Sequence, residues 1–292
     1  MLERTRIMVC AVTAMLSLGA CVPAQTESDL SREFNEDTTM GEIQAAGVLR
    51  VGIPTESAPF ATGGERDPRG FAVDLAELIS NTMGVEADMT VGPSEQLLAQ
   101  LGQEELDIAF SLLPVTEEGY REAPHADPFY LGHQRLLAPR AAGISSTDDL
   151  AGARVCSYTE ETGLDIGGLL ERVRAIEAAN PDECVRALDT REAEAATAPD
   201  VLLMDMMAKL ERTSRVRYAI TGDQLTTEGY GIAMAPGAGA FVEYLNSVLE
   251  EAEESGDWAA SYRRWLAPYS GTPARPPEST AEEAAALYPS EA

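Results

Sequence analysis

Charged side chains gather at places where the sequence predicts the strands of a parallel sheet to end. Ligands of such sheets bind outside the carboxyl ends of the strands, where the strand order reverses. A carboxylate ligand would meet like charges there, whereas an amine or another small cation would be attracted. The alternative is that most of these glutamates point into solvent, as charged runs usually do. The group comprises Glu56, Glu117, Glu118, Glu160, Glu161 and Asp205, with Arg121 as its one cation.

Asp205 has the most specific surroundings of these carboxylates. Four apolar residues, Val201–Met204, precede it, so we predict a strand over Asp200–Met204 that ends at this side chain. A carboxylate that emerges from a dry strand would form charge-assisted hydrogen bonds with a bound cation. The alternative role, capping a helix that begins at Met206, is compatible with the first.

Strands and helices alternate around these residues, which predicts an α/β fold with largely parallel sheets. Gly84 and Gly152 mark helix ends. The expected helices are Phe71–Ile79 continuing to about Met83, Ser94–Leu101, Thr147–Gly152, Leu164–Ala179, Glu183–Ala193, Met206–Arg212, and two near the end with aromatic stripes. The expected strands are Val48–Ile53, Ala87–Val91, Asp107–Leu112, Gln134–Pro139, Arg154–Ser157, Asp200–Met204, Arg217–Ile220 and Tyr230–Ala235.

The N-terminus is typical of an exported protein. Arg4 and Arg6 precede a mostly apolar run over Ile7–Ala20, which is too short to span a bilayer. The run ends before Cys21 in a sequence that resembles the lipobox of bacterial lipoproteins, so residues 1–20 are predicted to be a signal peptide and Cys21 to be acylated. The alternative is an ordinary secretory signal with a chance cysteine. Residues 21–42 are expected to form a flexible tether.

Two further cysteines, Cys156 and Cys184, remain once Cys10 is removed with the signal peptide and Cys21 carries lipid. An even pair in an exported protein predicts one disulfide. Closing that loop would stabilise the fold by roughly 3.6 kcal/mol in the chain-entropy model. Two reduced, buried thiols are the alternative.

The composition sets the class of protein. The chain has 292 residues, of which 45% are hydrophobic and 24% charged, enough for a globular protein of about two domains. A net charge of −28, with Lys209 as the only lysine, argues against nucleic-acid binding. His125 and His133 are too few and too isolated for a histidine metal centre, and no cofactor is expected.

Eight short segments, in order behind the lipobox, together carry a family resemblance. They resemble family 3 of the bacterial solute-binding proteins, the extracytoplasmic receptors of ABC importers for polar amino acids. The cysteine pair is most similar to that of glutamate- and glutamine-binding lipoproteins of actinobacteria. The resemblance runs from about Ile43 to Tyr269. The segments are Val48–Gly52, Ala58–Phe60, Gly70–Ala76, Asp107–Ala109, Asp127–Tyr130, Leu150–Val155, Asp200–Asp205 and Tyr230–Ala233.

The resemblance implies a periplasmic-binding-protein-like fold of type II, with two α/β lobes that are joined by a two-strand hinge and close around a ligand. The first lobe would comprise residues 43–134 plus 228–269, and the second residues 140–222. Hinge segments would lie near Gln134–Pro139 and Gly222–Gly229. Residues 270–292, rich in Pro, Glu and Ala, are expected to be a disordered tail.

The expected pocket departs from the family. Asp205 matches the aspartate that pairs with the ligand's α-ammonium, but Gly119 stands where the family has the arginine that binds the α-carboxylate, and Arg121 is a possible substitute. Ser57 replaces the covering aromatic residue, and Phe60 lines the pocket or the core beneath it. The residues expected to bind the ligand are Asp205, Phe60, Ser57, Glu56, Thr116, Arg121, Glu160 and Thr162.

The function that follows is a non-enzymatic, lipid-anchored substrate-binding protein on the extracytoplasmic face of the cell membrane. It would deliver a polar amino acid or a related amine-bearing solute to ABC permease subunits. One alternative is a receptor with a degenerate pocket that signals to a membrane partner. A weaker one is a dehydratase-like enzyme, because the same fold hosts such enzymes and clustered carboxylates can serve acid/base chemistry.

Overall fold

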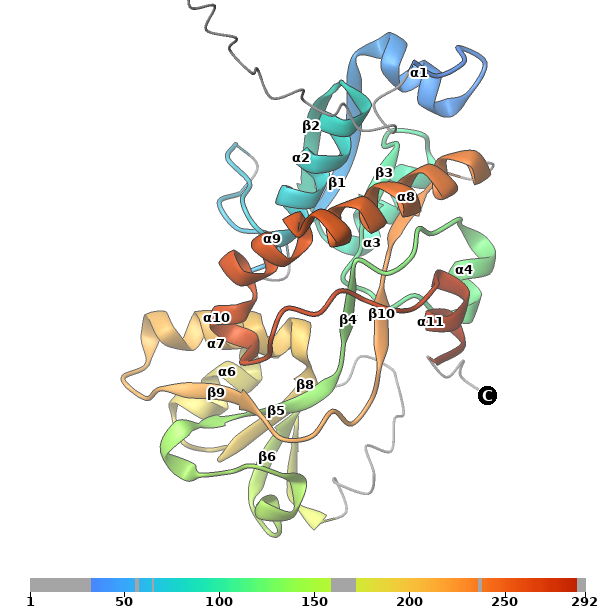
Figure 1. Ribbon diagram of the computed structural model, residues 1–292. Helices are drawn as coiled ribbons and strands as arrows, with labels where there is room; N and C mark the ends of the chain where they lie inside the picture. Colours follow the sequence, from blue (N-terminus) through green and yellow to red (C-terminus); the bar gives the residue numbers. More distant parts are fainter. Residues whose placement is uncertain (1–32, 56–57, 65, 159–171, 236–237, 288–292) are drawn as a thin grey trace, which may run out of the picture.

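The computed structural model describes residues 33–55, 58–64, 66–158, 172–235 and 238–287. The expected signal peptide, Cys21 and the tether up to residue 32 lie outside this part of the chain. Within it, no helix combines the length and the apolar character needed to cross a membrane. Two sheets, each covered by helices, form two lobes joined by a narrow pair of strands (Figure 1).

The first lobe is built on a four-stranded sheet in the order β11-β3-β1-β2. β1 is parallel to β2 and β3, and β11 is antiparallel to β3. Helix α2 (Phe71–Met83) buries one apolar face, and Gly84 ends it in the left-handed conformation. The strands are β1 (Val48–Pro54), β2 (Glu86–Gly92), β3 (Ile108–Phe110) and β11 (Ile232–Met234). The other helices are α1 (Thr39–Ala46), α3 (Ser94–Gly102), α4 (Glu117–Glu122), α8 (Gly239–Ser255) and α9 (Asp257–Trp265).

The second lobe has a five-stranded sheet in the order β7-β6-β8-β5-β9. Helices α6 (Pro181–Asp189) and α7 (Asp200–Thr213) pack on it, and two short 3₁₀ turns span Arg140–Ala142 and Thr147–Leu150. The strands are β5 (Gln134–Pro139), β6 (Arg154–Ser157), β7 (Arg174–Glu177), β8 (Ala195–Pro199) and β9 (Tyr218–Thr221).

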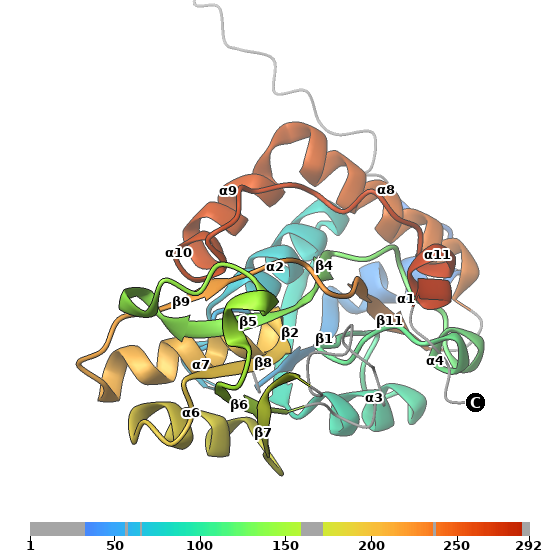
Figure 2. The same ribbon diagram turned by 90° about the horizontal axis from the view of Figure 1, so that it is seen from below.

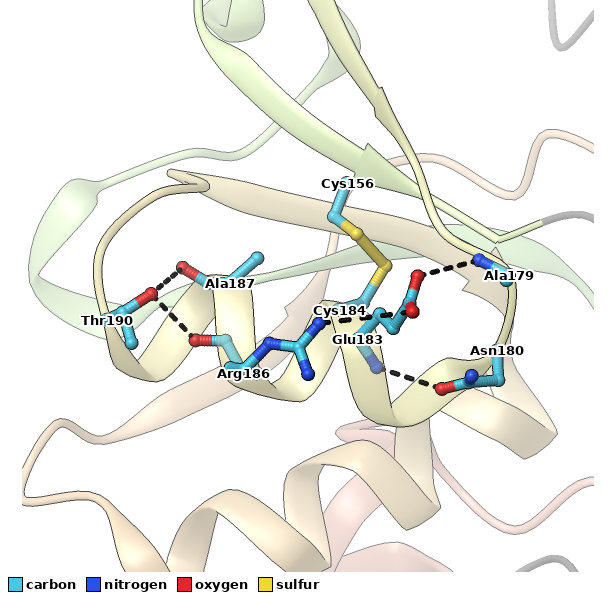
Figure 3. Close-up of a disulfide and its surroundings, with 8 residues drawn as sticks. All are labelled: Cys156, Ala179, Asn180, Glu183, Cys184, Arg186, Ala187 and Thr190. Atoms are coloured by element: carbon cyan, nitrogen blue, oxygen red, sulfur yellow. Dashed lines mark hydrogen bonds and ion pairs between the residues drawn. A yellow bond between two sulfur atoms is a disulfide. The ribbon is translucent and has the colours of Figure 1, made fainter.

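A disulfide joins β6 to α6 in the second lobe (Figure 3). Cys156 and Cys184 are bonded, with their Cα atoms 5.5 Å apart, and both are fully buried. At the start of α6, Asn180 Oδ1 accepts a hydrogen bond of 3.1 Å from the backbone N–H of Glu183, which caps the helix. The predicted disulfide is confirmed.

The hinge is an antiparallel pair of strands, β4 (Tyr130–Gly132) and β10 (Glu228–Tyr230). Tyr130 lies opposite Tyr230 in this pair. The prediction that Gln134–Pro139 forms part of the hinge is wrong, because these residues are β5, inside the second sheet between β8 and β9. Both neighbours of β5 belong to the second lobe, and its side chains at Leu136 and Leu137 are fully buried in that lobe.

Two further predictions in the second lobe are corrected. The strand predicted over Asp200–Met204 is the beginning of α7, and the strand before it is β8, composed of Ala195–Pro199. The stretch Leu164–Ala179 was expected to be helical, but Arg174–Glu177 is β7, paired in parallel with β6. Residues 164–171 of that stretch lie outside the described residues.

Both ends of the described chain are packed against the lobes. Phe34 lies edge-to-face on Tyr244 with ring centroids 5.0 Å apart, so residues 33–42 are docked and are not part of a free tether. The prediction that residues 270–292 are disordered is wrong up to residue 287. After α10 (Ala267–Ser270), the chain crosses the hinge and ends in α11 (Ala281–Leu287), whose alanines pack against β10 and α4 (Figures 1 and 2).

Candidate functional site

Half of the residues expected to bind a ligand can be placed. Glu56, Ser57, Glu160 and Thr162 lie outside the described residues, as does Glu161. The described ones are Asp205, Phe60, Thr116 and Arg121.

Asp205 lies in the second turn of α7 and makes contacts in both lobes. It is 6% exposed. Its Oδ1 accepts a hydrogen bond of 3.2 Å from the backbone N–H of Ala58, which belongs to the first lobe. Its Oδ2 lies 2.8 Å from Nζ of Lys209, one turn further along α7. The carboxylate therefore bridges the lobes and is paired with an ammonium group.

Lys209 holds two carboxylates at once. Its Nζ also lies 2.6 Å from Oδ1 of Asp182 on α6. Burial alone would lower the pKa of Lys209, but the hydrogen bonds to Asp182 and Asp205 raise it above its ordinary value. Burial raises the pKa of Asp205, and the hydrogen bond from Lys209 opposes this rise. The ion pair thus lets a carboxylate remain charged at a place where burial would otherwise favour its neutral form.

Thr116 and Arg121 lie on α4, away from Asp205. Thr116 caps the helix, since its Oγ1 accepts a hydrogen bond of 3.0 Å from the backbone N–H of Gly119. Arg121 forms an ion pair with Glu117 one turn away, and its side chain is 68% exposed. Helices α4 and α7 stand well apart in both views (Figures 1 and 2). In this arrangement Arg121 does not join Asp205 in one site.

Phe60 belongs to the core of the first lobe. Its side chain is fully buried and meets the rings of Phe71 and Tyr130 edge-to-face, with centroids 6.0 and 5.2 Å away. Of the two places considered for Phe60, the structure favours the core beneath the pocket. Its contact with Tyr130 links this core directly to the hinge strand β4.

A second polar group, which the sequence did not indicate, is buried where the hinge meets α7. Tyr130 Oη donates a hydrogen bond of 3.1 Å to Oδ2 of Asp200, and Tyr230 Oη donates one of 2.8 Å to Oε2 of Glu228. Asp200 and Glu228 are 3% and 2% exposed. We call Asp200, Glu228 and these two tyrosines the hinge cluster.

Asp200 is the most perturbed carboxylate of the hinge cluster. It is the first residue of α7, and its Oδ1 has no hydrogen-bond partner in the described part of the chain. Burial raises its pKa to about 7, although hydrogen bonding of the carboxylate to the backbone of His133 and to Tyr130, and the nearby charge of Arg135, oppose this rise. Burial likewise raises the pKa of Glu228. The one sequence signal for Asp200 was its position directly after a strand, and the misplaced strand hid it.

The two sites differ in what they can do chemically. The Asp205 carboxylate sits at a contact between lobes, where it accepts hydrogen bonds from cationic and amide donors. The polar side chains of the hinge cluster are buried and bonded mainly to one another. Among the described residues, no group of three or more His, Cys, Asp or Glu side chains is arranged to hold a metal ion.

Comparisons with known proteins bear on this arrangement. The family described as bacterial extracellular solute-binding proteins, family 3, matches residues 49–268. The ABC transporter glutamine-binding protein GlnH of Bacillus subtilis (strain 168) is 25% identical over 262 residues, covering 87% of this chain and 93% of that protein. The L-cystine-binding protein TcyJ of Escherichia coli (strain K12) is 23% identical over 245 residues, covering 80% and 88%.

Among solved structures, the fold is similar to that of an ancestral cationic amino acid solute-binding protein, AncCDT-1. The TM-score is 0.65 at 20% sequence identity, and the match covers 78% of this chain and 100% of the other. The two-lobed fold of type II periplasmic binding proteins, expected from the sequence, is therefore confirmed.

Proposed function

The chain belongs to the bacterial extracellular solute-binding proteins of family 3, and from this premise we propose that it binds an amine-bearing polar solute, an amino acid or a close relative, between its two lobes for an ABC importer. The relatives named above are called after glutamine, cystine and cationic amino acids, which share an α-amino group. Solute binding between two lobes couples occupancy to hinge closure.

The observation that carries the proposal is the placement of Asp205. A buried carboxylate that already touches both lobes can exchange or share its partners with the ammonium group of a solute in the same place. Arg121, the cation expected to bind a solute carboxylate, is exposed and paired with Glu117. An electrostatic balance of this kind favours a solute with a positive charge over one with a second carboxylate.

Isothermal titration of the full chain with arginine, putrescine, glutamine and glutamate tests the solute class. We expect arginine or putrescine to bind most tightly and glutamate to bind at least about tenfold more weakly, a difference of about 1.4 kcal/mol. Glutamate as the tightest ligand would overturn the proposed class while leaving the family untouched. Mass spectrometry of the recovered solute, if unchanged, separates binding from the enzymatic alternative.

A pair of variants tests the role of Asp205 in that site. Asp205→Asn removes the carboxylate that bridges the lobes, and we expect the dissociation constant to rise about tenfold, because a charge-assisted hydrogen bond is lost. Asp182→Asn is the matched control, since it removes the other partner of Lys209 without touching the first lobe. If both variants bound the solute with equal affinity, Asp205 would not be a ligand-binding residue.

The lipid anchor is part of the same proposal, and the lipobox-like sequence before Cys21 supports it. Acyl chains contribute about 0.8 kcal/mol per buried CH₂, so several chains hold a protein on a membrane. In fractionated cells, the wild-type chain is expected with the membrane and Cys21→Ser in the soluble fraction. Cys10→Ser, inside the expected signal peptide, is the control and should behave like wild type. Membrane-bound Cys21→Ser would contradict the anchor.

A further inference from the structure

Residues 271–287, which we call the strap, lie beyond the part of the chain that the family model matches. The family match ends at residue 268. The strap is nevertheless packed: it leaves α10, crosses the hinge strands and ends in α11 against the first lobe (Figures 1 and 2).

Ser270, the residue directly before the strap and its Gly271, is bonded to both lobes. Ser270 Oγ accepts a hydrogen bond of 2.9 Å from Tyr262 Oη on α9 of the first lobe. The carbonyl of Ser270 accepts one of 3.1 Å from Nη1 of Arg135, on β5 of the second lobe. Helix α10, which ends at Ser270, packs against α7 and β9 of the second lobe. Thr272 then returns to Tyr262, with 2.8 Å between their hydroxyl oxygens.

The far end of the strap is fastened to the hinge itself. The backbone N–H of Ala281 donates a hydrogen bond of 2.9 Å to Oδ1 of Asp127, three residues before β4. Ala284 is fully buried and faces Gly229, the central residue of β10. A Cβ atom at Gly229 would collide with the side chain of Ala284, so the close approach of α11 depends on this glycine.

The segment between the two ends resists stretching and bending. Pro273, Pro276 and Pro277 each fix the backbone angle φ at their own position, which stiffens the segment. Together with the hinge it borders a cavity of about 380 Å³ that Tyr130, Asp200 and Tyr262 also line. The strap therefore lies over the hinge cluster and joins the second-lobe contact at Ser270 to α11 on β10.

We propose that the strap is a brace that limits the rotation of the second lobe about the hinge. Rotation moves Arg135 relative to Tyr262, and Ser270 is bonded to both. With the strap docked, Ser270 is held from its C-terminal side as well, so rotation must break the Arg135 bond or lift Ala284 from Gly229. Rotation of the lobes thus acquires a free-energy cost that the same chain without the strap would not have.

The decisive measurement is the distance between the lobes without added solute. The two exposed residues Ala99, on α3 of the first lobe, and Asp189, at the end of α6 of the second lobe, are replaced by non-canonical amino acids that carry spin labels. Ala284→Arg puts a charged side chain into the buried contact with Gly229 and should undock α11, so we expect the distance distribution to widen roughly twofold. Ala286→Arg makes the same change on the exposed face of α11 and should leave the distribution unchanged.

A second variant keeps the test decisive if Ala284→Arg remains docked. The chain shortened to end at Gly271 retains Ser270 and its two hydrogen bonds but has no strap, and it should show the same widening. Distributions equal to wild type in both Ala284→Arg and the shortened chain would overturn the brace. Because no solute is present, these outcomes are independent of the proposed solute and of Asp205.

Discussion

Helix α7 carries two buried carboxylates five residues apart, and their surroundings differ in one decisive respect. Asp205 is in contact with an ammonium group, Lys209, and with a backbone N–H of the other lobe. Asp200 is bonded to the neutral hydroxyl of Tyr130, and its Oδ1 has no partner in the described chain. Burial therefore raises the pKa of Asp200 to about 7, whereas at Asp205 the pair with Lys209 opposes the same effect.

The difference shows that burial alone does not decide the charge of a carboxylate. A directly bonded cation offsets much of the desolvation cost at Asp205, while a hydroxyl and the more distant Arg135 do not at Asp200. Protonation of Asp200 at the hinge is therefore coupled to stability, whereas Asp205 at the contact between lobes keeps its charge. Variants that give one carboxylate the surroundings of the other test this difference.

The largest expected effect is at Asp200. The unfolded chain releases this proton near pH 3.8 and the folded protein near pH 7, so stability is lost as the pH rises between these values, by up to about 4 kcal/mol. The side chain in Asp200→Asn cannot ionise, so this variant should not show that fall in the free energy of unfolding. In denaturant unfolding, the free energy of unfolding of the variant relative to wild type should be higher at pH 8 than at pH 4.

The control for Asp200 is Asp189→Asn, which changes an exposed carboxylate at the end of α6. Glu228 and Glu253 also have pKa values raised by burial and add to the slope of wild type, so the difference between variant and wild type isolates Asp200. An unchanged pH slope in Asp200→Asn would show that the hinge carboxylate is ionised at neutral pH.

A smaller effect is expected from Lys209→Met, which gives Asp205 the kind of environment that Asp200 has. The variant leaves a buried carboxylate without its cation, and we expect a loss of about 2 kcal/mol at pH 8, below the usual cost for a fully buried pair because the Lys209 side chain is 33% exposed. The loss should shrink toward pH 4, where the unpaired Asp205 can take up a proton.

Thermal unfolding of Lys209→Arg provides the matched comparison, since arginine keeps the positive charge at the end of a long, flexible side chain. We expect this variant to retain most of the stability of wild type. If Lys209→Met were as stable as Lys209→Arg at pH 8, the ion pair would not be what holds Asp205 in its charged form.

The sequence predicted the first lobe better than the second for a physical reason. Helix α2 has a clear apolar face and a terminal glycine, and β1 lies between Gly47, which ends α1, and the polar Thr55, so local pattern and packing agree. In the second lobe, β8 consists mainly of alanine, which is depleted in strands and is a weak signal for one. The stronger apolar run after it, Val201–Met204, fits a strand or a helix equally well, and it is helical.

The strap and the hinge cluster depend on contacts between distant parts of the chain. A segment rich in proline, glutamate and alanine has the composition of a disordered tail. It is ordered here because Gly229 leaves room for Ala284 to pack. Likewise, nothing local to Asp200 shows that Tyr130, seventy residues earlier, will be its partner. The disulfide was predictable because the expected signal peptide and lipid anchor account for Cys10 and Cys21, which leaves Cys156 and Cys184 to pair.

The smallest expected effect measures how much the neutral hydroxyl of Tyr130 stabilises the Asp200 carboxylate, which has no directly bonded cation. Tyr130→Phe removes the hydrogen bond to Asp200 Oδ2 and leaves the ring in the core with Phe60, so we expect a loss of about 1 kcal/mol. The loss should be greatest above pH 7, where the carboxylate is ionised and the bond is charge-assisted. Tyr230→Phe, which removes the donor to Glu228, is the control for a lost hinge hydroxyl.

Unfolding curves at pH 5 and pH 8 distinguish an ionised from a neutral Asp200. If Tyr130→Phe lost the same stability at both pH values, the hydroxyl would be bonded to a neutral Asp200. The hinge carboxylate would then keep its proton well beyond pH 7.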